Sequence, residues 1–261
     1  MTLTLIALAL YLGAAGFLVK ALARGDDNPR GWTVPAALAV VFHAGFHLAA
    51  WRAAGGLDLH FFAALSLVGL GMAALTTAFG TSGRMAALGV IVFPLAAASL
   101  CGYAAYGHMP PAEGLDWRLQ LHAWCALLAY ATLAIAALLA LMLWAQERAL
   151  RRREFHGWLR ALPPLTELET LLFRTIAVGF VLLTATLLTG ILFVENLLEQ
   201  HLVQKTVLSV LSWLLFGGLL LGRWRYGWRG TTAVRWTLAA MILLVLGFFG
   251  TKFLLEVHPT G

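Results

Sequence analysis

Charged residues are scarce in this 261-residue chain: Asp, Glu, Lys and Arg make up 11% of it, whereas 61% is hydrophobic. A water-soluble domain carries roughly a quarter of its residues as charges. The shortage therefore excludes a soluble globular protein. The apolar residues instead gather in runs of about 18 to 27, each long enough to cross a hydrocarbon layer roughly 30 Å thick.

Cysteines and catalytic motifs are also scarce. The two cysteines, Cys101 and Cys125, lie in apolar runs and form no Cys-x-x-Cys pair, which excludes a disulfide framework, a zinc framework and covalent haem attachment. No phosphate-loop, dinucleotide-binding or HExxH motif is present, so the sequence does not predict an enzyme. The net charge of +6 comes from basic residues beside apolar runs, and it predicts membrane lipids rather than nucleic acid as partners.

The apolar runs predict an all-α integral membrane protein, a polytopic bundle of about eight transmembrane helices forming a single transmembrane helical domain, residues 1–261. No basic residue precedes the first run, and Lys20 and Arg24 follow it, which favours an uncleaved helix over a secretory signal. The spans are expected near residues 2–22, 33–53, 60–80, 85–106, 119–145, 170–195, 205–222 and 234–255.

The distribution of basic residues predicts the orientation. Fourteen of the 18 Lys and Arg residues fall in or beside the odd-numbered connections between the spans. The exceptions are Arg52, Arg118, Lys205 and Lys252. Because basic residues are retained on the cytoplasmic side, both termini are expected outside the cytoplasm.

The connection 146–169 is the longest one expected in the cytoplasm. Its basic stretch, 147–160, is expected to extend a helix and fix topology, or else to lie along anionic headgroups or dock a protein partner. A break follows at Pro163-Pro164, and Thr166 with Glu169 has the pattern of a capping box that begins the sixth helix. The segment 223–230 predicts an aromatic and basic interfacial anchor.

Three histidines stand at membrane depth: His43 and His47 in the second span and His122 in the fifth. An ionisable side chain there usually faces the bundle interior and has a partner. His43 and His47 are four residues apart and so share one helix face. His122 is expected roughly one turn below the outer surface, with His47 about two turns and His43 about three turns below it.

Facing imidazoles on membrane helices are what axial ligation of a haem iron requires. The alternative is that each histidine is a hydrogen-bonded packing residue. Tyr130, eight residues after His122, is expected either to hydrogen-bond a ligand or to line a helix contact. Lys205 is expected to snorkel to the headgroups, or to pair with a glutamate or a ligand's propionates. Solvated surface, loop or tail roles are expected for His60, His108, His156, His201 and His258.

Several short stretches together resemble one family. They are Phe42-His43-Ala44, Leu121-His122-Ala123, Leu128-Ala129-Tyr130-Ala131, Gln146, Leu162-Pro163-Pro164-Leu165 with Glu169 and Phe173, Lys205-Thr206-Val207-Leu208-Ser209 with Trp213, and Gly227-Trp228-Arg229-Gly230. In this order the sequence resembles the cytochrome c assembly superfamily of CcsA- and CcmC-like haem-handling membrane proteins, and within it the short eight-span branch described as YpjD- or HemX-like.

The resemblance implies an inner-membrane protein that binds, carries or exports haem for cytochrome c maturation or influences haem synthesis. It implies haem b as cofactor, with His122 and His43 as the matching histidines and therefore as metal ligands. Together with the depths, helix faces and charges described above, the predicted cofactor-binding residues are His43, His47, His122, Tyr130 and Lys205. The chain departs from the larger members in two ways. The outer connection 107–118 holds one tryptophan, and Gln204 stands where relatives often place a second outward histidine.

Two other functions remain open from the sequence. One is a non-haem accessory or regulatory protein linked to divalent-metal export or tetrapyrrole synthesis, although no span carries the cluster of Asp or Glu that a hard cation favours. The other is a b-type electron-transfer subunit, which usually needs four intramembrane histidines, whereas three stand at usable depth here.

Overall fold

The computed structural model describes residues 2–26, 29–80, 86–107, 116–153, 164–193 and 200–253, with the side chains of 200–202 left aside. Within these ranges the chain is all-helical. Its helices are α1 (Thr2–Ala23), α2 (Thr33–Ala54), α3 (Phe61–Gly80), α4 (Ala86–Tyr106), α5 (Trp117–Arg152), α6 (Leu165–Phe193), α7 (Gln200–Tyr226) and α8 (Gly230–Val245), followed by the π-helical turn η2 (Leu246–Gly250).

Eight helices of the described ranges are long and apolar enough to cross a membrane, which confirms the predicted fold class. The predicted spans differ from the helices mainly at polar ends. The helix α5 runs on to Arg152 and α6 begins at Leu165, because Ala, Leu, Glu and Arg beyond the apolar segment are good helix formers. Hydropathy marks where a helix leaves the hydrocarbon, not where it ends.

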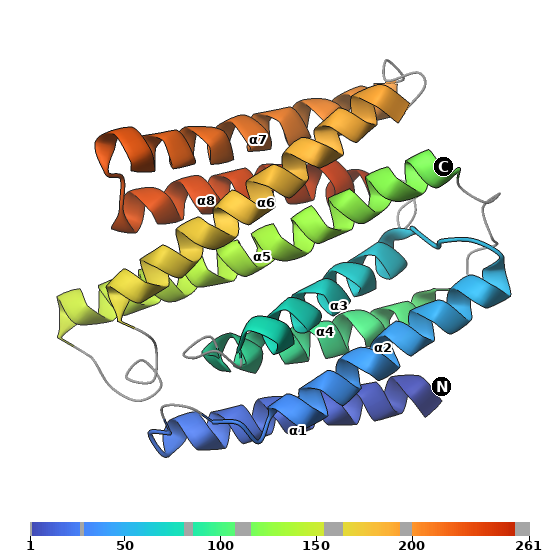
Figure 1. The fold of residues 1–261 in the computed structure, drawn as a ribbon, viewed down its shortest axis with the longest axis horizontal. Helices are drawn as coiled ribbons and strands as arrows, with labels where there is room; N and C mark the ends of the chain where they lie inside the picture. The colour runs from blue at the N-terminus through green and yellow to red at the C-terminus, as the bar shows by residue number, and fades with distance from the viewer. Residues whose placement is uncertain are drawn as a thin grey trace. The chain divides into compact units, whose positions relative to one another are not determined.

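The chain divides into two compact units: unit 1 comprises 1–114 and 149–164, and unit 2 comprises 115–148 and 165–261. Unit 1 contains α1 to α4, and unit 2 contains most of α5 together with α6, α7, α8 and η2 (Figure 1). The contacts of each candidate residue are therefore those within its own unit.

In unit 1, α4 packs against both α1 and α3, and α2 packs against α1 and α3. A close approach of α3 and α4 requires Gly69, because a Cβ there would meet the Ser99 side chain and lie 3.3 Å from the Ala96 Cα. Small residues at such contacts let membrane helices pack backbone to backbone. The result places the interior faces of α1, α2 and α3 together, where the second-span histidines lie.

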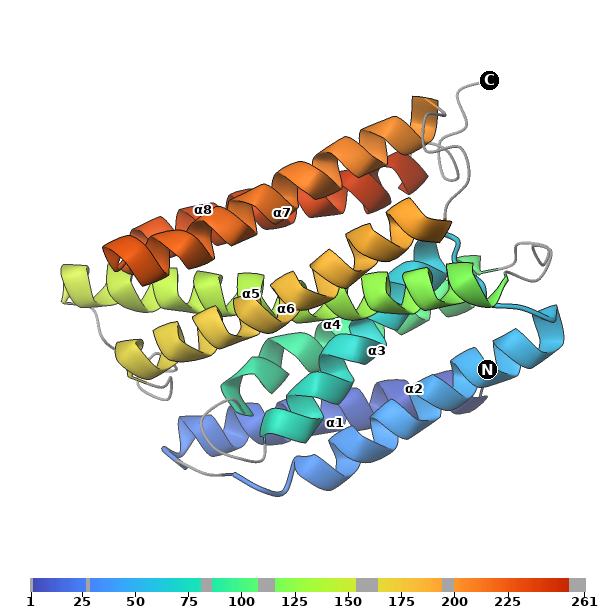
Figure 2. The ribbon, with the colours of Figure 1, turned by 45° about the horizontal axis from the view of Figure 1, so that its top comes forward.

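In unit 2, α7 and α8 run side by side and α6 packs on α7 (Figure 2). Two glycines in left-handed backbone conformations shape the turn between α7 and α8: Gly227 at φ 67° and Gly230 at φ 52°. Glycine adopts this conformation without the steric strain that a Cβ would add. The turn brings Arg229 and Gly230 back toward α6.

The sixth helix begins directly after the prolines, as predicted, but the predicted capping box is wrong. Thr166 lies inside α6 rather than ahead of it. Glu169 uses its carboxylate elsewhere: Oε2 accepts from Arg229 and Oε1 accepts from the Gly230 N–H. Glu169 therefore bonds residues that are distant in the sequence, instead of capping the start of α6 as the local pattern predicted.

Candidate functional site

His43 is fully buried inside unit 1, with both ring nitrogens occupied. Its Nδ1 lies 3.2 Å from the Tyr11 hydroxyl on α1, and its Nε2 lies 2.9 Å from the Ser66 hydroxyl on α3. The His47 Nε2 lies 3.0 Å from the same Ser66 oxygen. Three helices therefore contribute to one buried polar cluster, which we call the Ser66 cluster: Tyr11, His43, His47 and Ser66.

Ser66 has a single hydroxyl proton for two imidazoles. It can donate to one Nε2 and must accept from the Nε2–H of the other. The two rings also stack, with centroids 5.4 Å apart and planes 23° apart, as expected for residues four apart on one helix face. These contacts satisfy neutral imidazoles without a bound group, in line with the packing alternative for His43.

A second polar cluster lies at the end of unit 1 that holds the connection between α2 and α3. The His60 Nδ1 donates to Asp58 Oδ1 at 2.6 Å, and the Tyr103 hydroxyl donates to Asp58 Oδ2 at 3.1 Å. The His47 ring stacks on the Tyr103 ring at 4.9 Å. The solvated surface role expected for His60 is wrong, because its side chain is only 9% exposed.

Asp58 lies outside the membrane-spanning helices, and its pKa reflects this cluster. Burial acts to raise the pKa of Asp58, but hydrogen bonds from the His60 side chain and backbone and from Tyr103 outweigh it and hold the pKa below its ordinary value. Asp58 is therefore ionised near neutral pH and accepts hydrogen bonds with both oxygens.

The lowered pKa predicts an acid-sensitive contribution to the stability of unit 1. The ionised form is favoured in the folded state, so Asp58 stabilises fully above its unfolded pKa of about 3.9, and this contribution fades as pH falls through the lower folded value. Thermal unfolding in detergent from about pH 6 down to about pH 3 should show a steeper loss for wild type than for Asp58→Asn. Parallel curves would contradict the expectation.

His122 stands near the start of α5 in unit 2. Its Nδ1 lies 3.2 Å from the Thr189 hydroxyl oxygen on α6. Thr189 donates its own proton back to the carbonyls of Ala185 at 2.8 Å and Thr186 at 3.0 Å, so its oxygen accepts the Nδ1–H of His122. The imidazole is thereby fixed as the tautomer whose lone pair is on Nε2.

The neighbouring residue Gly190 leaves room for this ring. A Cβ at Gly190 would lie 3.2 Å from the Cε1 of His122, tighter than ordinary van der Waals contact. Farther along α6, a Cβ at Gly179 would run into the Leu133 side chain of α5. The absence of a side chain at Gly190 thus lets the imidazole of His122 lie close to α6.

The remaining predicted cofactor residues also lie in unit 2. The Tyr130 hydroxyl donates to the Leu244 carbonyl at 2.6 Å, and its ring packs on Phe248 and Phe249 in η2. Tyr130 therefore makes the helix contact considered for it, and a contact with a ligand stays a prediction. Lys205 lies on α7, where its backbone carbonyl faces Gly247 of η2. A π-helical turn is often found at functional positions.

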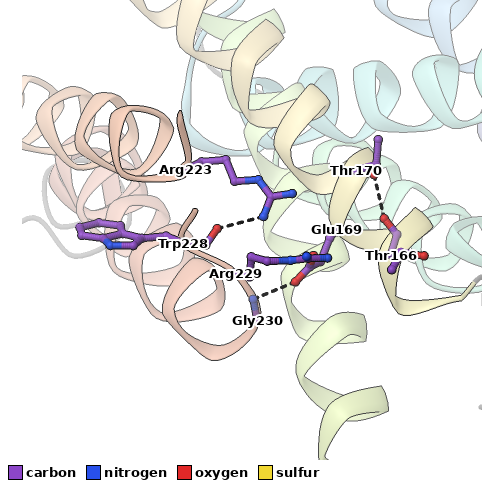
Figure 3. Close-up of polar contacts among 7 residues, drawn as sticks. All are labelled: Thr166, Glu169, Thr170, Arg223, Trp228, Arg229 and Gly230. Atoms are coloured by element: carbon purple, nitrogen blue, oxygen red, sulfur yellow. Dashed lines mark hydrogen bonds and ion pairs between the residues drawn. The ribbon is translucent and has the colours of Figure 1, made fainter. Parts of the chain in front are cut away.

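In unit 2, hydrogen bonds and an ion pair join α6 to the turn before α8 (Figure 3). The Arg229 guanidinium contacts Glu169 Oε2 at 2.8 Å, and the Gly230 N–H donates to Oε1 at 2.9 Å. Arg223 donates to the Trp228 carbonyl at 3.2 Å and covers the Phe173 ring at 4.7 Å. The predicted interfacial anchor therefore also ties α6, α7 and α8 together, which sequence reasoning missed.

The structure brings His43 and His47 together in unit 1 and places His122 in unit 2, so a shared ligand for the two sets remains a prediction. Within the described ranges, no group of three or more His, Cys, Asp or Glu residues could hold a bare metal ion. The predictions for other residues lie outside the described part of the chain: His108, His156, the His201 side chain, His258 and residues 154–160 of the basic stretch.

Comparison with known proteins places these residues in a wider context. The family model described as "Cytochrome C assembly protein" matches residues 32–258. "Inner membrane protein YpjD" of Escherichia coli K12 is 34% identical over 139 residues, 53% of this chain and 52% of that protein. A 28.8 kDa protein in the nifR3-like 5′ region of Azospirillum brasilense is 31% identical over 250 residues, 94% and 87% of the two chains.

A further relative is "Protein HemX" of Brevibacillus brevis, 26% identical over 134 residues, 51% of this chain and 49% of that protein. The matched segment thus spans about half the length of YpjD and of HemX. No solved structure matches the chain.

Proposed function

Because the chain belongs to the cytochrome c assembly protein family, we propose that it is a haem-binding, multi-pass protein of the bacterial inner membrane that holds haem or passes it on. The name of the YpjD relative supports the location. The group proposed is haem b, whose iron would supply the Lewis-acid centre that imidazole nitrogens bind. The chain's own part is to bind and orient that group.

The observation that carries this proposal is the hydrogen bond between His122 Nδ1 and Thr189. Imidazoles that bind metals almost always donate their second ring N–H to a fixed acceptor, which sets the tautomer and aims the lone pair. Thr189 provides this acceptor, since its own proton is committed to backbone carbonyls. His122 would thus offer Nε2 to the haem iron.

The second axial ligand is proposed to come from His43 or His47. Binding iron through Nε2 would break the hydrogen bond between that ring and Ser66. The serine hydroxyl would keep its hydrogen bond with the other imidazole. His43 would retain Tyr11 as the acceptor of its Nδ1–H, the same arrangement that Thr189 gives His122. The Ser66 cluster is therefore compatible with both a resting and a ligated second-span histidine. Tyr130 and Lys205 are proposed to line the same cofactor site.

The test is an optical spectrum of the detergent-purified protein before and after dithionite. Wild type expressed with ample haem is expected to show a Soret band, and His122→Ala is expected to lower the haem content and shift the band. His156→Ala, which changes a histidine of the predicted cytoplasmic connection, is the matched control and should match wild type. A colourless wild-type protein that takes up no added hemin would contradict the proposal.

Thr189 is expected to act as a positioning residue for His122. Thr189→Val keeps the shape of the side chain but removes the acceptor of the Nδ1–H, so hemin affinity should fall about tenfold or more. Thr189→Ser retains the hydroxyl and should stay near wild type. Hemin titration followed by absorbance measures both, and equal affinity of the valine and serine variants would show that the contact does not orient the ligand.

A further inference from the structure

The fold uses two of the four arginines around the turn between α7 and α8. Arg229 pairs with Glu169, and Arg223 donates to a carbonyl of the turn. The other two, Arg225 and Arg235, have exposed side chains that make no ion pair or hydrogen bond with the described residues. These two guanidiniums are therefore available to a partner.

Both side chains lie near the depth of lipid headgroups. Arg225 stands one residue before the end of the apolar span Val203–Tyr226, and Arg235 stands five residues after the start of the span Gly230–Gly250. At 1.5 Å of rise per residue, Arg235 is roughly 7.5 Å along α8 from its first residue. A long basic side chain exposed at this depth extends along the helix to the interface. A phospholipid, rather than a water-soluble molecule, is thus in position to contact Arg235.

Three aromatic rings lie between these arginines, and we call them the aromatic row: Tyr226, Trp228 and Trp236. The first two rings stack with centroids 6.3 Å apart, and the centroids of the two tryptophans are 5.0 Å apart. Two glycines of α7 make room for the tryptophans. A Cβ at Gly222 would run into the Trp228 ring, and one at Gly218 would lie 3.1 Å from the Trp236 ring. The row is therefore held against the backbone of α7.

The two arginines stand at the two ends of this row. Gly218, Gly222 and Arg225 are spaced by four and then three residues, so they share one face of α7. Arg225 thus continues the face on which the tryptophans lie, and Arg235 is the chain neighbour of Trp236 on α8. Tyrosine and tryptophan rings at membrane surfaces lie at headgroup level. Charge and aromatic surface therefore occur together at the depth of a phosphate group.

The charge of this surface favours one class of lipid. A guanidinium binds phosphate oxygens through paired N–H donors, and no carboxylate of the described residues contacts either arginine. A zwitterionic headgroup carries its own ammonium, which two guanidiniums repel. An anionic headgroup lacks that ammonium and retains its net negative charge. Each arginine near such a headgroup should strengthen binding about fivefold.

We propose that Arg225 and Arg235, together with the aromatic row, form a binding site for an anionic phospholipid at this end of unit 2. The guanidiniums bind the phosphate, and the rings pack beside the glycerol and the first part of the acyl chains. The proposal is independent of the haem function, because no histidine contributes to this surface.

The first test is native mass spectrometry of the purified full chain with added lipid, which gives the Kd of the first bound molecule. Phosphatidylglycerol should bind at least about tenfold more tightly than phosphatidylcholine with the same acyl chains. Arg225→Gln and Arg235→Gln should each weaken phosphatidylglycerol binding about fivefold and leave phosphatidylcholine binding unchanged. Arg174→Gln is the matched control, because Arg174 is also exposed and without a described partner but lies on α6.

Thermal unfolding provides a second measurement that separates lipid binding from folding. In detergent alone, Arg225→Gln/Arg235→Gln should unfold at the same temperature as wild type, since neither side chain contacts the fold. Added phosphatidylglycerol should raise the unfolding temperature of wild type and not that of the double variant. An equal loss of lipid affinity in Arg174→Gln would show that total charge rather than this surface attracts the lipid. That result, or a double variant that binds phosphatidylglycerol as wild type does, would overturn the proposal.

Discussion

Replacing His43 with alanine is expected to destabilise the protein by about 3 kcal/mol, the largest effect of any single histidine in unit 1. The substitution opens a cavity at a fully buried position and leaves the hydroxyls of Tyr11 and Ser66 without their ring partner. Hydrogen bonds between membrane helices are individually modest, near 0.6 kcal/mol on average, so most of the loss comes from packing. Thermal unfolding in detergent measures it.

His47→Ala provides the matched control on the same helix face. His47 is only half-buried and makes one hydrogen bond, to Ser66, beside its stack on Tyr103. Its loss should destabilise by about 1 kcal/mol, and Ser66 can then donate fully to His43. An equal effect of the two substitutions would show that His43 is not the centre of this cluster.

The pairing within the second span could be predicted from sequence because it depends on one helix alone. Residues four apart share a face, and the rings of His43 and His47 do stack. Their partners could not be predicted, since Tyr11 and Ser66 come from other helices and each looks like an ordinary polar residue in an apolar run. The helices themselves were predictable because lipid demands long apolar segments.

His60 was missed for a related reason. A histidine just before a span is usually solvated, and hydropathy says nothing about a connection that folds back on the bundle. The sequence does contain one signal, Asp58 two residues before His60. At this spacing an Asp carboxylate can accept hydrogen bonds from the backbone N–H and the side chain of the later residue. The burial of the His60 side chain depends on tertiary contacts of this connection, such as the hydrogen bond of Asp58 with Tyr103 on α4, 45 residues beyond it.

Glu169→Ala is the second substitution with a large expected effect, about 3 kcal/mol of lost stability in unit 2. Glu169 is 6% exposed, and its carboxylate joins α6 to both the Arg229 side chain and the Gly230 backbone. Removing it leaves the partly buried Gly230 N–H and a guanidinium without their acceptor. The Arg229 side chain is 56% exposed, so solvent compensates part of that loss, and Arg229→Ala alone should lower the stability by about 1 kcal/mol or less.

A double-mutant cycle separates the two contacts of Glu169. If Arg229 acts through this carboxylate, Glu169→Ala/Arg229→Ala should be no less stable than Glu169→Ala, because the second change removes a partner already lost. Glu169→Gln keeps a carbonyl oxygen for the Gly230 N–H and should fall between wild type and Glu169→Ala. Strict additivity of the two alanine substitutions in thermal unfolding would mean that Arg229 stabilises the turn through contacts other than Glu169, such as its stem against α8.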